Sequence, residues 1–247
     1  MKKTITVLIT CFIISSFSTQ LSFKDAQLKY PRVKQAYKDK SKCISKLLKS
    51  HNISNAEIYI RAFKLEEKIE VWAKEKTDVT YKLITSYPFC FSSGGLGPKR
   101  QQGDYQIPEG FYVIDRFNPE SNFHLSLGIN YPNASDKIKS NHSRLGGDIF
   151  IHGSCFSVGC IPITDDWIEE LYILSVEAKN GGQTSIPVHI FPFYLSEDNY
   201  EKHIKDTSIS GNHSKFWNNL KEGYTYFETN RTVPTIEVSE EGHYIFK

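Results

Sequence analysis

The 247-residue sequence lacks several features that would each, on its own, assign a protein to a class. It carries 30 basic and 28 acidic residues, so no excess of charge favours a nucleic-acid partner. Internal repeats, heptad runs and low-complexity tracts are also lacking, which argues against solenoids and long coiled coils. Beyond the first 20 residues, no apolar run approaches the roughly 20 residues of a membrane-spanning helix. The remaining expectation is one soluble domain with extensions.

The N-terminus is the single strongly apolar segment. A basic start at residues 1–3 is followed by an apolar stretch from about Ile5 to Phe17, with small residues at Ser16 and Ser18. This order predicts a secretory signal peptide over residues 1–20, since the apolar run is short for a membrane span. An uncleaved membrane anchor is the alternative.

The hydrophobic pattern predicts a mainly β domain with a few peripheral helices. Apolar residues at helical spacing predict a helix over 33–50, and later alternation predicts a series of strands. The expected strands cover 57–63, 68–73, 79–84, 111–115, 123–127, 148–152 and 187–193. Further helices are expected from Thr164, as the cap, to about 178 and over 215–220, with a terminal hairpin over 235–246.

The most informative local pattern is a histidine and two cysteines in the segment IHGSCFSVGC, directly after an apolar run. A thiol becomes a strong nucleophile at neutral pH when a base lies nearby, and imidazole suits that task. The pattern therefore predicts Cys160 as nucleophile and His152 as base. Ser157 and Gly159 form a small turn that can direct backbone N–H groups at a developing oxyanion.

The cysteines also have to be considered as disulfides, because exported chains meet oxidising conditions. Four remain after the predicted signal, namely Cys43, Cys90, Cys155 and Cys160, and they allow three pairings. A Cys155–Cys160 bridge would leave the histidine and the glycine turn unexplained, although a reversible bridge could mask Cys160. Cys43 and Cys90 carry no motif, so each is expected as a buried small hydrophobe or as one partner of a structural pair.

A long segment over 92–110 contains five glycines and two prolines. Loops of that length in compact domains are usually functional or disordered. Its Lys99-Arg100 pair could meet a substrate carboxylate, with a solvated basic turn as the alternative. Arg144, upstream of the histidine motif, could orient substrate. The expected substrate-binding residues are Lys99, Arg100, Arg144, Ser157 and Gly159.

An ordered set of motifs links these segments. It consists of GLGPKR at 95–100, GD at 103–104, PEGFY at 108–112, IHGS at 151–154 and SxGC at 157–160. Together they resemble the catalytic domain of the L,D-transpeptidase (YkuD-type) family, in its YafK-like branch. The resemblance implies that family's fold, a mixed β-sheet sandwich or barrel. The expected division is a signal peptide at 1–20, a helical extension at 21–54, the catalytic domain at 55–195, and a C-terminal helix and hairpin extension at 196–247.

The resemblance implies acyl transfer on the stem peptides of peptidoglycan in a bacterial periplasm, with no cofactor. Cys160 matches the family's nucleophile and His152 its activating histidine, while the Gly153 carbonyl would hold the other imidazole nitrogen. A thioester formed at diaminopimelate would pass to an amine in crosslinking or to water in hydrolysis, for example in release of a wall-linked lipoprotein. Val158 stands where common members have histidine, which bears on substrate preference.

Two non-enzymatic hypotheses stay open from the sequence. His152, Cys155 and Cys160 could ligate zinc together with His142 or His124, although the spacing is unlike that of paired-cysteine knuckles. A catalytically silent wall-binding domain, with a groove drawn from the 13% of aromatic residues, is the other. If there is no zinc site, His124 and His142 are expected on the surface or in a groove.

Overall fold

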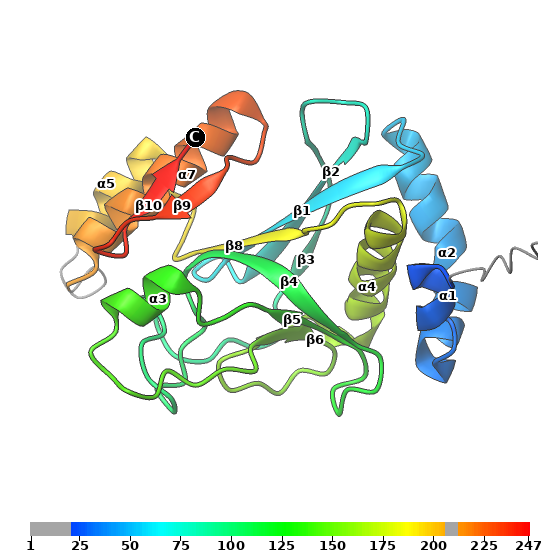
Figure 1. The fold of residues 1–247 in the computed structure, drawn as a ribbon, viewed down its shortest axis with the longest axis horizontal. Helices are drawn as coiled ribbons and strands as arrows, with labels where there is room; N and C mark the ends of the chain where they lie inside the picture. Colours follow the sequence, from blue (N-terminus) through cyan, green and yellow to red (C-terminus); the bar gives the residue numbers. More distant parts are fainter. Residues whose placement is uncertain (1–20, 206–211) are drawn as a thin grey trace, which may run out of the picture.

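The structure is a computed structural model that describes residues 21–205 and 212–247. Its centre is a curled eight-stranded sheet in the order β3-β2-β1-β8-β4-β5-β6-β7 (Figure 1). Its strands are β1 Ala56–Phe63, β2 Lys68–Glu75, β3 Lys82–Pro88, β4 Gly110–Asn118, β5 Ser126–Ile129, β6 Phe150–His152, β7 Ile161–Pro162 and β8 Pro187–Phe191. Parallel pairs join β1 to β8 and β6 to β7, and the other neighbours are antiparallel. The expected mainly β, mixed-sheet fold is confirmed.

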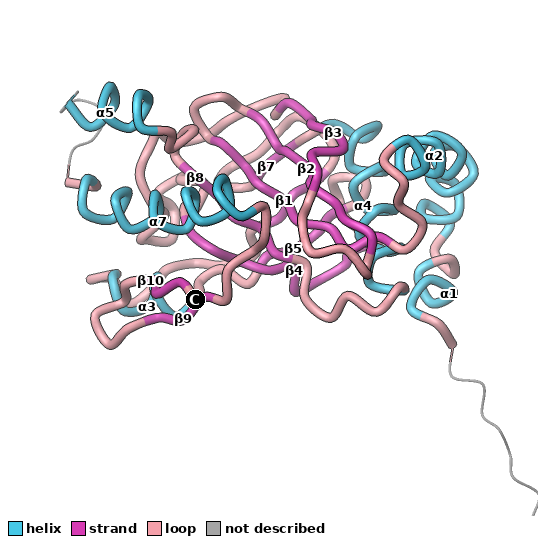
Figure 2. The backbone as a smooth tube through the Cα atoms, turned by 90° about the horizontal axis from the view of Figure 1, so that it is seen from above, coloured by secondary structure: helices cyan, strands magenta, loops and turns pink. Residues whose placement is uncertain are grey.

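Helices lie at both ends of the sheet (Figures 1 and 2). They are α1 Phe23–Gln27, α2 Pro31–Ser50, α3 Ala134–Lys139, α4 Thr164–Asn180, α5 Glu197–Lys205 and α7 Ser214–Asn230, followed by the hairpin of β9 Ile236–Val238 and β10 Tyr244–Phe246. At one end α1 and α2 pack against α4. At the other lie α5, α7 and the hairpin, so the N-terminal and C-terminal regions lie on opposite sides of the sheet.

Most predicted strands form, with shifted ends. The strand expected over 79–84 is wrong in its first half, because residues 79–81 precede β3. The strand expected over 123–127 lies at 126–129 as β5. Alternation of apolar residues thus found the strands but not their ends, which depend on the partner strand.

The helix predictions differ more from the structure. The helix over 33–50 is confirmed as α2, whereas the one expected over 215–220 continues to Asn230 because buried residues recur at helical spacing. Thr164 is the first residue of α4 and not its cap, since no side-chain cap bond forms there. The unpredicted α3 has a sequence signal in the capping box between Asn133 and Asp136. The predicted signal peptide at 1–20 lies outside the described residues.

Both faces of β1 are buried, which explains how the terminal regions attach. Ile58, Ile60 and Ala62 join the core cluster that contains the buried face of α4. The alternate residues Tyr59 and Phe63 pack instead in clusters with residues of α7. Because side chains alternate across a strand, one strand supports a core on each side of the sheet.

Candidate active site

Strands β6 and β7 bring the two predicted reacting residues together. Their parallel register pairs His152 with Pro162 and Ile151 with Ile161, which sets Cys160 opposite Phe150. Cys160 itself lies in a bend directly before β7, so the paired strands place the segments of His152 and Cys160 side by side. The Phe150 N–H also donates to the Cys160 Sγ at 3.3 Å, which fixes the thiol at the end of β6.

His152 is held as a neutral base. Its Nδ1 lies 2.5 Å from the Gly153 carbonyl oxygen. A carbonyl only accepts, so Nδ1 carries the proton and Nε2 keeps its lone pair. The imidazole is buried beneath the Phe123 ring, with centroids 4.6 Å apart. Burial lowers the pKa of His152, so the ring is neutral at pH 7.

Gly153 has to be glycine for steric reasons. A Cβ there would lie 2.5 Å from Oδ1 of Asp165 and 2.8 Å from the Phe123 carbonyl oxygen. The same Asp165 oxygen accepts from the Ser154 N–H at 2.7 Å. The start of α4 therefore fixes the chain immediately after His152, and with it the carbonyl that orients the ring.

Cys160 is half-buried and free of any disulfide. Burial raises the pKa of its thiol, against the opposing effect of the Phe150 N–H. Its Sγ also lies 3.5 Å from the Asp148 carbonyl oxygen, an acceptor that suits a thiol and not a thiolate. The thiol and the imidazole are thus both neutral at rest rather than an ion pair.

Two consecutive backbone N–H groups at the nucleophile donate to serine hydroxyls. The Gly159 N–H donates to Ser93 Oγ at 2.7 Å, and the Cys160 N–H donates to Ser157 Oγ at 3.0 Å. Gly159 has φ +87°, which glycine adopts without strain. The turn expected from the sequence is present, but its N–H groups are already used. Ser93 was missed because a serine beside glycines carries no motif, although it lies in the 92–110 segment that was expected to be functional or disordered.

A disulfide joins Cys90 to Cys155, with Cα atoms 5.3 Å apart. It ties the segment after β3 to the loop that leads to the nucleophile. A Cys155–Cys160 bridge is therefore absent among the described residues, and so is the expected alternative of a Cys43–Cys90 pair. Cys43 is free and exposed on α2 instead of buried. Since cysteine pairing depends on the path of the chain between them, the sequence could not select it.

The disulfide also removes the predicted zinc site, because Cys155 has no free thiolate to offer. His124 contacts Glu169 at 2.8 Å, and His142 is exposed. Within the residues described, no group of three or more histidine, cysteine or acidic side chains is arranged to hold a metal ion.

Lys99 and Arg100 lie in internal ion pairs and do not face an open site. Lys99 Nζ contacts Asp104 at 2.6 Å, and Arg100 contacts Asp136 at 2.6 Å. Both predicted substrate contacts are thus engaged in holding the loop. Arg144 is exposed, and its guanidinium has no partner among the residues that the structure describes. It remains the free cation beside the loop.

A buried ion pair that the sequence did not indicate anchors the same loop. Lys64 Nζ contacts Glu109 at 3.0 Å and donates to the Gly97 carbonyl at 2.7 Å. The other oxygen of Glu109 accepts from Trp217 Nε1 of α7 at 2.7 Å. The C-terminal region therefore reaches the loop that covers the site.

Exposed apolar side chains border the nucleophile. Phe91 and Phe156 each follow one cysteine of the disulfide, and Val158 lies two residues before Cys160. We call Phe91, Phe156 and Val158 the apolar rim. Exposed apolar groups of this kind are suited to contact a bound ligand.

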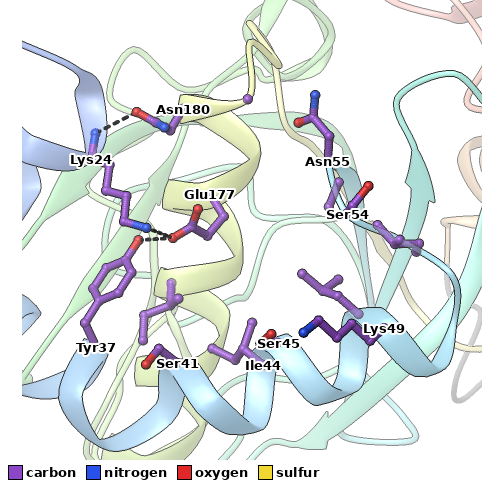
Figure 3. A pocket seen from close by; sticks show the side chains of 15 residues that line it. Lys24, Tyr37, Ser41, Ile44, Ser45, Lys49, Ser54, Asn55, Glu177 and Asn180 are labelled. Carbon is purple, nitrogen blue, oxygen red and sulfur yellow. Dashed lines mark hydrogen bonds and ion pairs between the residues drawn. The ribbon is translucent and has the colours of Figure 1, made fainter.

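A separate cavity of about 470 Å³ lies between α2 and α4 (Figure 3). At one of its ends Glu177 contacts Lys24 at 2.7 Å and Tyr37 at 2.9 Å. None of the predicted site residues lines it. The polar groups at that end are bonded to one another, and we assign the cavity no part in the chemistry.

Comparison with known proteins defines the class. No protein-family model matches the chain. It is 38% identical over 190 residues to proteins of Escherichia coli K12 and O157:H7, each called "Putative L,D-transpeptidase YafK", covering 76% of this chain and 73% of theirs. The chain belongs to the L,D-transpeptidase family. In the described part of the chain, no helix is long and apolar enough to cross a membrane.

Two solved structures show more distant similarity. The helical cell shape determining protein Pgp2 of Campylobacter jejuni aligns with a TM-score of 0.45 and 16% identity, covering 76% of this chain and 74% of that one. Bd1075 of Bdellovibrio bacteriovorus aligns with a TM-score of 0.40 and 19% identity, covering 76% and 78%. Neither similarity enters the functional argument below.

Proposed function

We propose that the protein is a peptidoglycan L,D-transpeptidase that works through a cysteine acyl-enzyme. The observation that carries this proposal is that His152 lies in β6 and Cys160 directly before the paired strand β7, with His152 Nδ1 held by the Gly153 carbonyl. This leaves Nε2 with its lone pair, so it can act as the base. Membership of the family supports the class of reaction.

In the proposed first step, His152 Nε2 takes the thiol proton as Cys160 Sγ attacks the carbonyl carbon of a diaminopimelate residue. The C–S bond forms, and the carbonyl π pair moves onto oxygen. When the tetrahedral intermediate collapses, the C–N bond breaks and the leaving amine takes the proton from His152. The product is a thioester on Cys160. Proton transfer coupled to attack suits a pair that is neutral at rest.

The thioester then passes to an acceptor. An amine of a second stem peptide gives a crosslink, and water gives hydrolysis, for example the release of a wall-linked lipoprotein. The partial exposure of Cys160 supports hydrolysis as the second candidate, since solvent can approach the thioester.

Substrate contacts follow from which charges beside the 92–110 loop stay unpaired. We assign the carboxylate of the stem peptide to Arg144, an exposed cation whose backbone carbonyl accepts from the Gln102 N–H and whose guanidinium has no partner in the described residues. The apolar rim would pack against the peptide on the other side. Lys99 and Arg100 then support the loop, because their charges are already paired.

We also propose that the protein acts in the periplasm. The Cys90–Cys155 disulfide is typical of an oxidising compartment, and the predicted signal peptide at 1–20 provides the route.

The test is mass spectrometry of diaminopimelate-containing muropeptides incubated with the purified protein, with Cys160→Ala beside it. Crosslinked dimers that require Cys160 would support transpeptidation, and Cys160-dependent loss of a terminal residue or attached peptide would support hydrolysis. Cys43→Ala is the matched control and should act like the wild type, since Cys43 is exposed on a distant helix. Product formation that survives in Cys160→Ala would contradict the proposal.

A further inference from the structure

The hydroxyl of Ser93 lies one peptide unit from the nucleophile, and only one of its three hydrogen-bonding positions is used. Its Oγ accepts from the Gly159 N–H at 2.7 Å. A serine hydroxyl has one donor and two acceptor positions. Among the described residues, no acceptor takes the Ser93 proton, and the side chain is only half-buried. The O–H is therefore available to a ligand at the thiol.

Ser157 differs from Ser93 in access. Its hydroxyl accepts from the Cys160 N–H at 3.0 Å, but the residue is 4% exposed and lies inside the turn. Acyl transfer needs donors aimed at the oxyanion, and backbone N–H groups next to the nucleophile commonly serve. Here both such N–H groups already donate to hydroxyls, so the donor that meets the substrate has to be another group. Ser93 is the accessible one.

We propose that Ser93 is a catalytic residue whose O–H donates to the oxyanion formed when Cys160 attacks an acyl carbonyl. The inference rests on the proposed function in taking Cys160 as an acyl-forming nucleophile. The Gly159 N–H donates into the Ser93 oxygen, and chained hydrogen bonds polarise one another, so the Ser93 proton becomes a stronger donor.

The proton count in this step is closed without any other reagent. As the C–S bond forms, the carbonyl π pair becomes the oxyanion that accepts the Ser93 O–H. As the oxyanion collapses, the C–N bond breaks and His152 gives its proton to the leaving amine. Ser93 keeps its proton throughout, and acts by stabilising charge.

The segment that carries Ser93 is fixed on both sides, which a preorganised donor requires. Before it, the Cys90 N–H donates to the Pro162 carbonyl at 3.0 Å, and the disulfide holds Cys90 to Cys155. After it, the Gly95 N–H donates to the Gln106 side chain at 3.2 Å. The anchors at Cys155 and Pro162 lie on either side of Cys160 in the chain, so this segment spans the nucleophile.

The test compares two reagents on purified wild type, Ser93→Ala and Ser93→Thr, with modification of Cys160 followed by peptide mass spectrometry. p-Nitrophenyl acetate acylates a thiol through an oxyanion, whereas iodoacetamide alkylates it by displacement without one. We expect Ser93→Ala to slow acylation of Cys160 about 100-fold, as loss of one oxyanion donor does. Alkylation should change less than about twofold, and Ser93→Thr, which keeps the hydroxyl, should recover most of the acylation rate.

Three results would overturn the inference. Acylation of Ser93→Ala at the wild-type rate or faster would mean that the hydroxyl is dispensable or blocks the N–H. An equal loss in both reagents would mean that Ser93 only supports the loop. A wild-type Cys160 that is alkylated but never acylated would remove the inference and the proposed function together. If acylation depends on Ser93 but the protein does not act on stem peptides, the inference about Ser93 would stand. Only the proposed substrate would then be wrong.

Discussion

Burial acts in opposite directions on the two reacting side chains. It lowers the pKa of His152 and raises the pKa of Cys160, because in both cases it disfavours the charged form. Many reactive cysteines lie in electropositive surroundings that lower the thiol pKa. Here the thiol would be activated only as its proton leaves for His152, which protects it from oxidation at rest.

The directions of these two pKa shifts predict how kcat/KM on stem peptides depends on pH. His152 has to be unprotonated, and its pKa is lowered, so the acid limb should lie below pH 6.5, the ordinary value for histidine being about 6.5. Because the pKa of the Cys160 thiol is raised, the thiol and the imidazole both stay neutral to higher pH, and kcat/KM should remain level to above about pH 8.5. Initial rates between about pH 4.5 and 10 would check this, and an acid limb at pH 7 or above would contradict it.

The role of a single residue could be predicted from the sequence where the residues that act with it are its neighbours in the chain. His152, Gly153 and Cys160 lie in one short segment, in which the structure has His152 held by the Gly153 carbonyl and Cys160 directly before the strand that pairs with β6; their catalytic roles stay predictions. Asp104 lies only five residues after Lys99. The charge of Lys99 alone favoured a contact with substrate, but in the structure that charge is paired with Asp104. Ser93 acquires its position from Gly159, 66 residues later, which no local pattern reveals.

Irregular segments, more than strands, hold the site at the scale of elements. The segment after β3 contacts both sides of the nucleophile turn through the Cys90–Cys155 disulfide and the Cys90 N–H to the Pro162 carbonyl. Strand β7 is only two residues long, so it cannot fix Cys160 by pairing alone. The crosslink supplies the constraint that a longer strand would give.

Removal of the disulfide in the double variant Cys90→Ala/Cys155→Ala should therefore lower both stability and activity. The double variant avoids a free thiol five residues from Cys160. We expect a loss of about 2–4 kcal/mol in the free energy of unfolding, measured by urea titration. Activity should fall further than the folded fraction accounts for, since Ser93 loses its anchor. Cys43→Ala is the control, and a double variant equal to it would contradict this role.

Elements were predictable where their own period defines them. Examples are the alternation in β1 and β2 and the helical spacing in α2. Each pattern reflects which faces of the element are buried. The short β7 and α3 escaped prediction, because two residues of strand and six residues of helix each hold less than two periods of their own pattern. Their existence depends on partners elsewhere in the chain.

Across the whole molecule, the C-terminal region completes the core and supports the site. Glu228 of α7 contacts the buried Arg61 at 2.6 Å, and Trp217 donates to Glu109. Glu109 in turn accepts from the Gly97 N–H at 2.7 Å and pairs with Lys64. A continuous set of contacts thus runs from Trp217 of α7 through Glu109 to Gly97 in the 92–110 loop, which the sequence could not show because Trp217 is distant from the loop in the chain.

Trp217→Phe tests this connection, because it keeps the ring but removes the indole N–H. Glu109 is fully buried, so one of its oxygens would lose that donor. We expect a loss of about 1–3 kcal/mol in the free energy of unfolding, with slower turnover as the loop loosens. Glu222→Gln on the exposed side of the same helix should change stability by less than about 0.5 kcal/mol. Equal stability of the two variants would show that the contact is dispensable.

The central claim is that Cys160 becomes acylated by a diaminopimelate-containing stem peptide. The most direct measurement is intact-protein mass spectrometry of the enzyme mixed rapidly with a purified tetrapeptide stem, followed by peptide mapping. The account predicts a mass increase that equals the peptide without its leaving amine, located on Cys160 and absent from Cys160→Ala. Turnover of the peptide with no adduct at Cys160, and undiminished in Cys160→Ala, would contradict it.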